Sequence, residues 1–204
     1  MDAHFEAFIG ATGSGKTTRL KKRWPRRAKR TLIWSPKERK DNYAALHKGT
    51  VICRTAGEVL AVLSKAGKRK PFHIVVIPTL KRKQDEALFS IVCKMVLAVE
   101  KVIMGVDELH SVTRPSWAPE GWVQLCFMGR ESGVWVFGSS QRPASVDKAF
   151  MGSLSYADVG RLPYDDDVKA MAKVIGVPAA EVAALLGYQS ISRDMLTGEV
   201  VRNL

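Results

Sequence analysis

The stretch Gly10-Ala11-Thr12-Gly13-Ser14-Gly15-Lys16-Thr17 constrains this chain more than any other feature. It matches the pattern G-x-x-x-x-G-K-[ST], which average residue frequencies place by chance in about one chain in a hundred of this length. An apolar run at 5–9 precedes it and a helical pattern follows, as the motif requires. A glycine-rich turn is the alternative interpretation. The sequence therefore predicts a phosphate-binding loop between a strand and a helix.

The residue types in this loop suit a bound nucleoside triphosphate. Glycines let the backbone curl until successive N–H groups point inward, and the following helix directs its free N–H groups at the same anion. A lysine at this position contacts the β- and γ-phosphates, and the next hydroxyl binds Mg²⁺. We thus expect ATP and Mg²⁺ as ligands, with the cofactor-binding residues Gly10, Ala11, Thr12, Gly13, Ser14, Gly15, Lys16, Thr17 and Thr18.

Apolar periodicity alternates along the chain between strand-like and helix-like segments. Buried strands are predicted at 5–9, 31–34, 51–53, 72–77, 102–106 and 134–138, and helices at 15–24, 56–65, 84–100 and 120–130. This alternation predicts an α/β fold with a mostly parallel central sheet flanked by helices. In the tail, the pattern predicts helices at 165–175 and 178–186, followed by a C-terminal β-hairpin of strands 188–195 and 199–203. We expect a single domain over 1–204, with a core at 5–160 and the tail at 163–204.

The net charge of +12 is unevenly distributed. Residues 1–83 hold 21 Lys and Arg against five Asp and Glu, mostly in clusters at 19–30, 37–40, 68–70 and 81–83. Each cluster alone is compatible with a solvated surface, but together they favour a polyanionic partner such as DNA. The three cysteines are widely spaced and fit neither a disulfide framework nor a zinc site, which indicates a reducing cytosol. The apolar runs are too short to span a bilayer and no signal peptide is recognisable, so no membrane span is expected.

Two carboxylates follow the predicted strand 102–106. If that strand lies beside the strand of the phosphate-binding loop, Asp107 is delivered to the metal, as in a Walker B arrangement. Glu108 is then placed to polarise an attacking water as a general base. An isolated Asp-Glu pair would be interpreted as a capping or surface pair, but its position downstream of the loop favours catalysis. His110 nearby is interpreted as a hydrogen-bonded structural residue, with a phosphate or nucleic-acid contact as the alternative.

A third set of polar residues surrounds the predicted strand 134–138. Gln141 follows it, and ligands of open parallel sheets sit at the carboxyl ends of the strands, so Gln141 is placed to sense the γ-phosphate or hold the attacking water. Arg130 precedes the strand at its opposite end. It either complements the dipole of the preceding helix or reaches the ATP of a neighbouring subunit as an arginine finger. Residues alone leave both interpretations open.

The order GATGSGKT, VIMGVDE and GRESGVWVFGSSQRP resembles the FtsK/HerA superfamily of DNA-translocating ATPases. Within it, the chain resembles the small genome-packaging ATPases of tailless, membrane-containing icosahedral viruses, over roughly residues 5–160. The resemblance implies a RecA-like P-loop sheet, a homo-oligomeric ring (hexamer or pentamer) and ATP-driven movement of double-stranded DNA into a preformed capsid. A capsid vertex or portal component is the expected partner, and host cytoplasm and virion the expected locations. Relatives often have Gly-Arg-His where this chain has Gly-Arg-Glu at 129–131, so any role of that histidine is missing.

By motif position, the resemblance implies a role for each candidate site residue. Lys16 and Thr17 bind phosphate and metal, Asp107 binds metal, and Glu108 is catalytic. Gln141 is the sensor and Arg130 the finger acting in trans. Three other functions compete with this prediction: a phage-assembly or mobile-element ATPase acting on DNA, a P-loop kinase, and a basic DNA-coating protein that uses ATP only for structure. Glu108, Gln141 and the basic half argue against a kinase.

Overall fold

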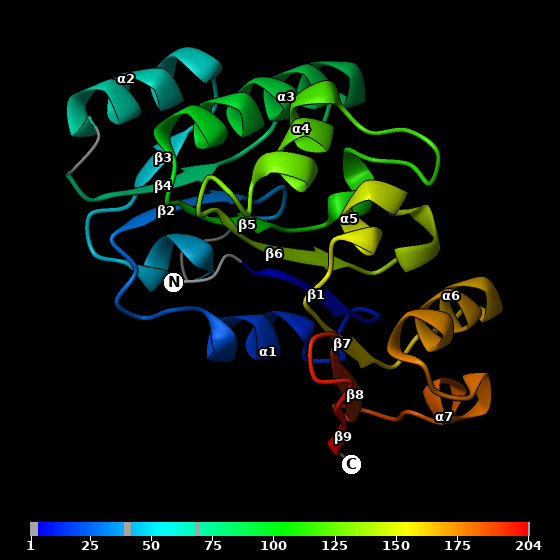
Figure 1. Ribbon diagram of the computed structural model, residues 1–204. Helices are drawn as coiled ribbons and strands as arrows, with labels where there is room; N and C mark the ends of the chain where they lie inside the picture. The colour runs from blue at the N-terminus through cyan, green and yellow to red at the C-terminus, as the bar shows by residue number, and fades with distance from the viewer. Residues whose placement is uncertain (1–3, 39–41, 68–69, 204) are drawn as a thin grey trace.

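The computed structural model describes residues 4–38, 42–67 and 70–203 (Figure 1). A nine-stranded sheet runs through it in the order β3-β4-β2-β5-β6-β1-β7-β8-β9. The strands from β3 to β7 in this order are parallel, and β8 and β9 are antiparallel. Their bounds are β1 Phe5–Ile9, β2 Arg30–Trp34, β3 Val51–Cys53, β4 Phe72–Val76, β5 Ile103–Val106, β6 Trp135–Ser140, β7 Tyr156–Gly160, β8 Ser190–Asp194 and β9 Val200–Asn203.

Helices cover both faces of this sheet. In Figure 1, α2, α3, α4 and α5 lie on one face and α1 lies on the other. The α-helices are α1 Lys16–Arg23, α2 Ala56–Ala66, α3 Arg82–Val99, α4 Glu120–Met128, α5 Lys148–Gly152, α6 Asp165–Ile175 and α7 Ala179–Ala183, and the 3-10 helices are η1 Tyr43–Leu46, η2 Leu109–Ser111 and η3 Pro143–Ser145. None of the helices in the described ranges is long and apolar enough to cross a membrane.

Two hydrophobic cores form on the two faces of the sheet. The larger one contains Phe5, Ala7 and Ile9 of β1, and the smaller one, under α1, contains Phe8 of the same strand. Successive side chains of a strand point to opposite faces, and both faces are covered here, so the central strands need apolar residues at nearly every position. All five residues of β1 are buried. This is why the strands are visible in the sequence as short continuous apolar runs.

The predicted fold class is confirmed: the sheet is mostly parallel, helices flank it, and β8 and β9 form the C-terminal hairpin. The sequence did not predict β7 or α5. The β7 sequence Tyr-Ala-Asp-Val-Gly has no continuous apolar run. Its burial comes from its place between β1 and β8, and Asp158 is tolerated there because Arg19 and Ser190 bond to its two carboxylate oxygens.

Two details of the sheet differ from the expectations. The role expected of Asp107 was conditional on strand 102–106 lying beside the strand of the phosphate-binding loop, but β6 lies between β5 and β1. The strand predicted at 134–138 also continues to Ser140, because Ser139 and Ser140 have hydrogen-bond partners for their hydroxyls. The register explains why Asp107 still reaches the site. Val106 is aligned with Gly138 and Ile9 with Ser140, so the three strands end close to one another.

Candidate active site at the carboxyl edge of the sheet

The loop 10–17 follows β1 and ends in the first turn of α1, at the edge where the parallel strands end, here called the carboxyl edge. Gly13 and Gly15 have φ values of 78° and 81°, in the left-handed region that favours glycine. Neighbouring strands anchor the loop, because the Gly10 N–H donates to the Ser140 carbonyl and the Ala11 N–H donates to the Arg161 carbonyl. The glycine pattern therefore produces the curled loop that the motif predicts.

The N-terminus of α1 is suited to an anion. No side chain caps it and its first turn contains no acidic residue, so its free N–H groups are left for a ligand. Lys16 lies in this first turn with only 8% of its surface exposed, and Thr17 beside it is partly exposed. A buried lysine next to unpaired N–H groups is a strongly positive environment. These residues fit the phosphates of a nucleotide.

Asp107 and Glu108 directly follow β5 and are both buried, with 7% and 4% of their surfaces exposed. Ser139 donates a hydrogen bond to Oδ1 of Asp107 and so fixes its carboxylate. Burial raises the pKa of Asp107 above its ordinary value, although the hydrogen bond from Ser139 and the charge of Lys16 act in the opposite direction. The Thr17 hydroxyl and the Asp107 carboxylate supply hard oxygen ligands of the kind that Mg²⁺ prefers.

Glu108 has φ 52° and ψ 51°, a left-handed conformation that is uncommon for residues other than glycine and that concentrates at functional sites. Its Oε1 accepts hydrogen bonds from Lys37, at 3.0 Å, and from Gln141, and lies 4.0 Å from Nζ of Lys16. Burial alone would raise the pKa of Glu108, but the charges of Lys16 and Lys37 outweigh it and hold the pKa below its ordinary value. The carboxylate therefore stays ionised near neutral pH.

Gln141 connects the acidic pair to the loop. Its amide donates to Glu108, while its Oε1 accepts a hydrogen bond of 2.7 Å from the Thr12 hydroxyl. His110 is hydrogen-bonded to Ser140 at 3.0 Å, in agreement with its structural interpretation, and also lies 3.5 Å from Oε2 of Glu108. The structure thus brings Lys16, Glu108 and Gln141 together, as the sequence predicted.

Arg130 lies at the opposite, amino edge of the sheet, just before β6. Its guanidinium donates to the Ser153 carbonyl at 2.6 Å and to the Ser155 hydroxyl at 3.2 Å. The whole length of β6 lies between it and Gln141, and the six residues of that strand span roughly 20 Å at 3.3 Å per residue. Arg130 is therefore not part of this chain's own site, and the structure leaves both interpretations of it open.

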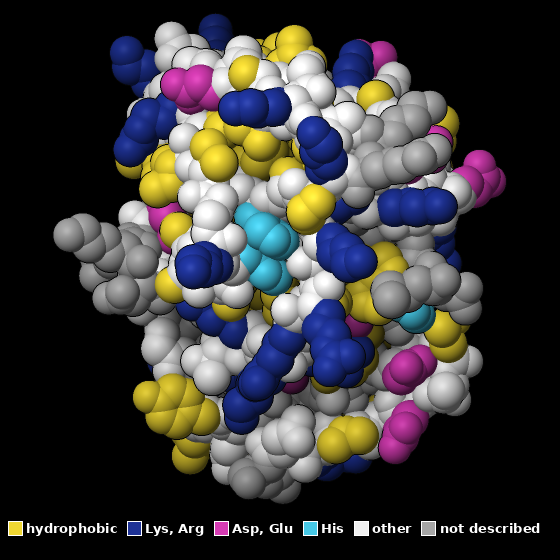
Figure 2. All heavy atoms as spheres, turned by 90° about the vertical axis from the view of Figure 1, so that its left-hand side faces the viewer, with side chains coloured by type: hydrophobic (Ala, Val, Ile, Leu, Met, Phe, Trp, Pro, Cys, Tyr) yellow, Lys and Arg dark blue, Asp and Glu magenta, His cyan; other side chains and the backbone are white. Residues whose placement is uncertain are grey.

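The basic clusters divide between the two edges of the sheet. The cluster 19–30 ends where β2 begins and the cluster 68–70 precedes the neighbouring β4, so both end at the amino edge. The clusters 37–40 and 81–83 follow β2 and β4, at the carboxyl edge. Arg39, Lys40, Lys68 and Arg69 lie outside the described residues. Figure 2 shows the amino-edge face, where Lys and Arg side chains are spread around histidines.

Sequence reasoning missed the position of Lys37 in the site. The sequence pattern places Lys37 in the basic cluster 37–40, but in the structure its ammonium donates a hydrogen bond to Glu108, the predicted general base. No local pattern indicates this contact, because it joins residues 71 positions apart. The only available signal was that Lys37 follows the strand 31–34, at the edge where ligands of parallel sheets bind.

No family model matches this chain. Protein P9 of Pseudoalteromonas phage PM2 is 25% identical to it over 181 residues, which cover 87% of this chain and 77% of P9. The genome packaging NTPase B204 of Sulfolobus turreted icosahedral virus 2, solved with AMPPCP, superposes with a TM-score of 0.73 and 13% identity over 98% of this chain and 97% of B204. VirB4 of Thermoanaerobacter pseudethanolicus superposes with a TM-score of 0.69 and 10% identity over 97% and 88%. These findings confirm the predicted resemblance, and the chain has the P-loop fold of the viral genome-packaging ATPases.

Proposed function

We propose that this protein is an ATPase that binds ATP through the loop 10–17 and uses its hydrolysis to translocate double-stranded DNA. The observation that carries the proposal is the meeting of Lys16, Glu108 and Gln141 in front of an uncapped helix N-terminus. A phosphate chain held by that N-terminus has a buried lysine on one side and an ionised carboxylate close by. A hydrolase needs a group that orients water, and Glu108 with Gln141 supplies it.

In this mechanism each side chain has a defined task. Lys16 and the loop N–H groups hold the phosphates and neutralise charge that develops on them. Gln141 positions the attacking water, and Glu108 accepts its proton. Thr17 and Asp107 are the residues that would hold Mg²⁺, which supplies charge neutralisation on the phosphate oxygens when bound.

Packaging of a viral genome into a preformed capsid is the specific role that we favour. The chain shares its fold with the genome packaging NTPase B204 of Sulfolobus turreted icosahedral virus 2 and with the DNA-packaging ATPase B204 of Sulfolobus turreted icosahedral virus. The exposed cations of the amino edge suit a DNA backbone. We further propose a homo-oligomeric ring in which Arg130 acts on the ATP of a neighbouring subunit. This ring contacts a capsid vertex or portal component in the host cytoplasm and is retained in the virion.

A DNA-acting ATPase of a phage-assembly or mobile-element system is the second candidate, because VirB4 shares the fold with a TM-score of 0.69. The two candidates place the same ATPase site in different assemblies. The neighbouring genes distinguish the two candidates, because the gene of a packaging motor is expected beside a gene for a major capsid protein.

Phosphate release with and without double-stranded DNA tests the proposal. We expect release by the wild-type protein and stimulation by DNA. The variant Lys16→Ala should fold but lose nucleotide affinity and turnover. The variant Glu108→Gln should bind ATP and turn over about 10²–10⁴-fold more slowly, because the amide cannot accept the proton of the water.

The other outcomes identify the alternatives. Phosphoryl transfer only in the presence of a small acceptor would indicate a kinase, and absence of turnover would indicate a structural DNA-coating protein. If Glu108→Gln loses nucleotide affinity but keeps its rate per bound ATP, Glu108 is a ligand and the roles assigned to the acidic pair are reversed.

A further inference from the structure

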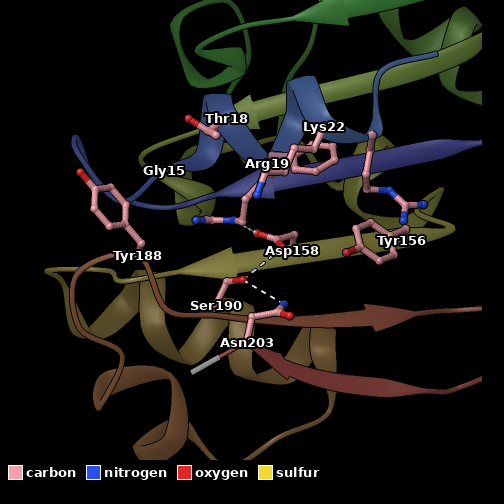
Figure 3. Close-up of a pocket in the computed structure, with 11 residues that line it drawn as sticks. Gly15, Thr18, Arg19, Lys22, Tyr156, Asp158, Tyr188, Ser190 and Asn203 are labelled. Carbon is pink, nitrogen blue, oxygen red and sulfur yellow. Dashed lines mark hydrogen bonds and ion pairs between the residues drawn. The ribbon is translucent and has the colours of Figure 1, made fainter. Parts of the chain in front are cut away.

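A cavity of about 640 Å³ opens beside the phosphate-binding loop, between α1, β7 and the terminal hairpin. Figure 3 shows its wall, with Tyr188 standing next to Gly15 and Thr18 at one end. Its volume is in the usual range for a small-molecule site. Among the residues that line it are Gly15, Thr18, Arg19, Tyr156, Tyr188 and Ser190.

The direction of a bound phosphate chain follows from the catalytic residues. The terminal phosphate has to lie near Glu108 and Gln141, and these residues are on the Thr12 side of the loop. The rest of the nucleotide then leaves the loop on its other side, past Gly15 and Thr18. That side opens into the 640 Å³ cavity, whereas a second cavity of about 380 Å³, which includes Thr12 and Gln141, lies at the catalytic end.

Tyr188 presents an aromatic surface at the mouth of the larger cavity. Tyr188 lies in the segment between α7 and β8, and 78% of its surface is exposed. A Cβ atom on Gly15 would be 3.1 Å from the ring, so the ring packs against the loop backbone. An exposed aromatic ring beside a phosphate-binding loop is a surface on which a base can stack, and such stacking contributes roughly 1–3 kcal/mol per base.

Arg19 and Asp158 shape the cavity floor. Arg19 bonds through Nε to Asp158 and through Nη1 to the Ser14 carbonyl of the loop. The other oxygen of Asp158 accepts a hydrogen bond from Ser190, so this carboxylate is already paired and presents no bare negative charge to a ligand. Nη2 of Arg19 is buried against Gly160 without a hydrogen-bond partner among the described residues, and the rest of the Arg19 side chain lines the cavity.

We propose that this cavity holds the nucleoside of the bound nucleotide, with the base stacked on Tyr188 and the ribose beside Arg19. The proposal rests on nucleotide binding by the loop 10–17. A nucleoside has an aromatic base, which matches the exposed ring of Tyr188. It also has a sugar rich in oxygen atoms, which matches a cavity floor formed by the ion pair of Arg19 and Asp158.

Binding of MgATP and of magnesium tripolyphosphate, measured by titration calorimetry, tests it. Tripolyphosphate has the phosphates without the nucleoside. Tyr188→Ala should weaken ATP binding about 5- to 100-fold, the equivalent of a lost stacking contact, and leave tripolyphosphate binding unchanged. Tyr188→Phe should bind ATP like the wild type because the ring remains. Tyr164→Ala is the matched control, an exposed tyrosine in the wall of the 380 Å³ cavity, and should leave ATP affinity unchanged.

Three results would overturn the proposal: wild-type ATP affinity in Tyr188→Ala, an equal loss of ATP and tripolyphosphate affinity in that variant, or weakened ATP binding in Tyr164→Ala, which would place the base in the opposite cavity. Failure of the proposed function is distinguishable. A wild-type protein that binds ATP but releases no phosphate would refute hydrolysis and still permit this test.

Discussion

Glu108 combines an uncommon backbone conformation with two cationic neighbours, Lys16 and Lys37. The conformation costs of order 1–3 kcal/mol, so the surrounding structure has to maintain it. Lys37 differs from Lys16 in being 67% exposed at its side chain, so it can leave Glu108 without disturbing the core. Its contribution to the charge of the site can therefore be tested separately.

We expect Lys37→Ala to move the acid limb of the rate–pH profile to higher pH. Lys37 holds the pKa of Glu108 down by its hydrogen bond and charge, so its removal raises that pKa and Glu108 loses its ionised form at a higher pH. The measurement is kcat for phosphate release between pH 5 and 8 at saturating ATP. Lys83→Ala, an exposed lysine of α3, is the control. An unmoved acid limb would show that Glu108 does not govern it.

At the scale of elements, close contacts between helices depend on single glycines. In α4, Gly121 packs directly on α3: a Cβ atom added to it would lie 2.0 Å from the Ser90 carbonyl oxygen. The Gly121 N–H also donates to the Ser90 hydroxyl at 2.9 Å. The two helices that cover β5 and β6 therefore approach each other at a position where only glycine fits.

Gly121→Ala should lower the free energy of unfolding by about 1–3 kcal/mol, because backbone atoms have to move apart to admit the methyl group. Urea denaturation measures the change. Gly57→Ala in α2 is the matched control, because its nearest atom is the Thr55 hydroxyl at 4.0 Å, and alanine there should be neutral or stabilising by about 0.5–1 kcal/mol. Equal midpoints for the two variants would contradict the packing argument.

A stacked histidine pair joins two other elements at the amino edge. The rings of His47, after η1, and His73, in β4, stack at 4.1 Å with an interplanar angle of 5°. His47 accepts a hydrogen bond from the Trp24 indole, and His73 is hydrogen-bonded to Thr31. Burial lowers the pKa of both, and the charge of His47 adds to the effect on His73. The folded protein therefore favours the neutral rings.

The free energy of unfolding should fall as the pH decreases below about 6.5, the ordinary histidine pKa. Below that pH the unfolded chain binds protons at His47 and His73, whereas the folded chain keeps these rings neutral. We expect a lower Tm at pH 5.5 than at pH 7.5, measured by circular dichroism. The double variant His47→Gln, His73→Gln should show a smaller decrease. If it shows the full decrease, these two histidines are not its source.

At the scale of the whole molecule, the amino edge presents exposed cations to a partner. Arg26, Arg27 and Lys29 are exposed at the amino edge, and Arg30 beside them donates to the Val99 carbonyl. At the carboxyl edge, Lys37 and Arg82 form ion pairs with Glu108 and Glu86. Cations that are already paired inside the protein contribute less to binding a polyanion.

Binding of double-stranded DNA should therefore depend on the amino edge. With about five phosphate contacts, log K should fall with log salt at a slope near −4 to −5. Reversing Arg26, Arg27 and Lys29 to Glu should weaken binding and make the slope about 2 to 3 smaller in magnitude. Reversing Lys81 and Lys83 is the control at the carboxyl edge. Unchanged affinity in the first variant would assign its cluster to a solvated surface.

In the ring of subunits that we propose, Arg130 acts on the ATP of a neighbouring subunit. Arg130→Ala should bind ATP normally but hydrolyse it about 10³–10⁵-fold more slowly, because a neighbour's γ-phosphate loses its cation. Mixing it with Lys16→Ala should restore some phosphate release, since junctions between the two variants rebuild complete sites. Subunit exchange is first verified with labelled protein. Full activity of Arg130→Ala alone would show that Arg130 is not the finger, and Arg114 or Arg142 would be tested next.

Local sequence patterns were sufficient to predict the phosphate-binding loop, most of the strands and the candidate site residues. Glycine spacing and the Lys-Thr pair predicted the phosphate-binding loop, and short apolar runs predicted six of the strands, because strands covered on both faces have to be apolar throughout. Polar residues that follow such runs lie at one edge of a parallel sheet. This rule identified the candidate site residues Asp107, Glu108 and Gln141.

Only the tertiary structure decided which of these segments are neighbours. Strand order depends on how the crossovers pack, which no local periodicity records, so the position of β6 between β5 and β1 was not predictable from residues. β7 was hidden for the same reason, since it is buried by its two neighbours and not by its own composition. Lys37 bonds to Glu108, and the ring of Tyr188 lies against Gly15. Both contacts join distant parts of the chain, so they exist only once the chain has folded.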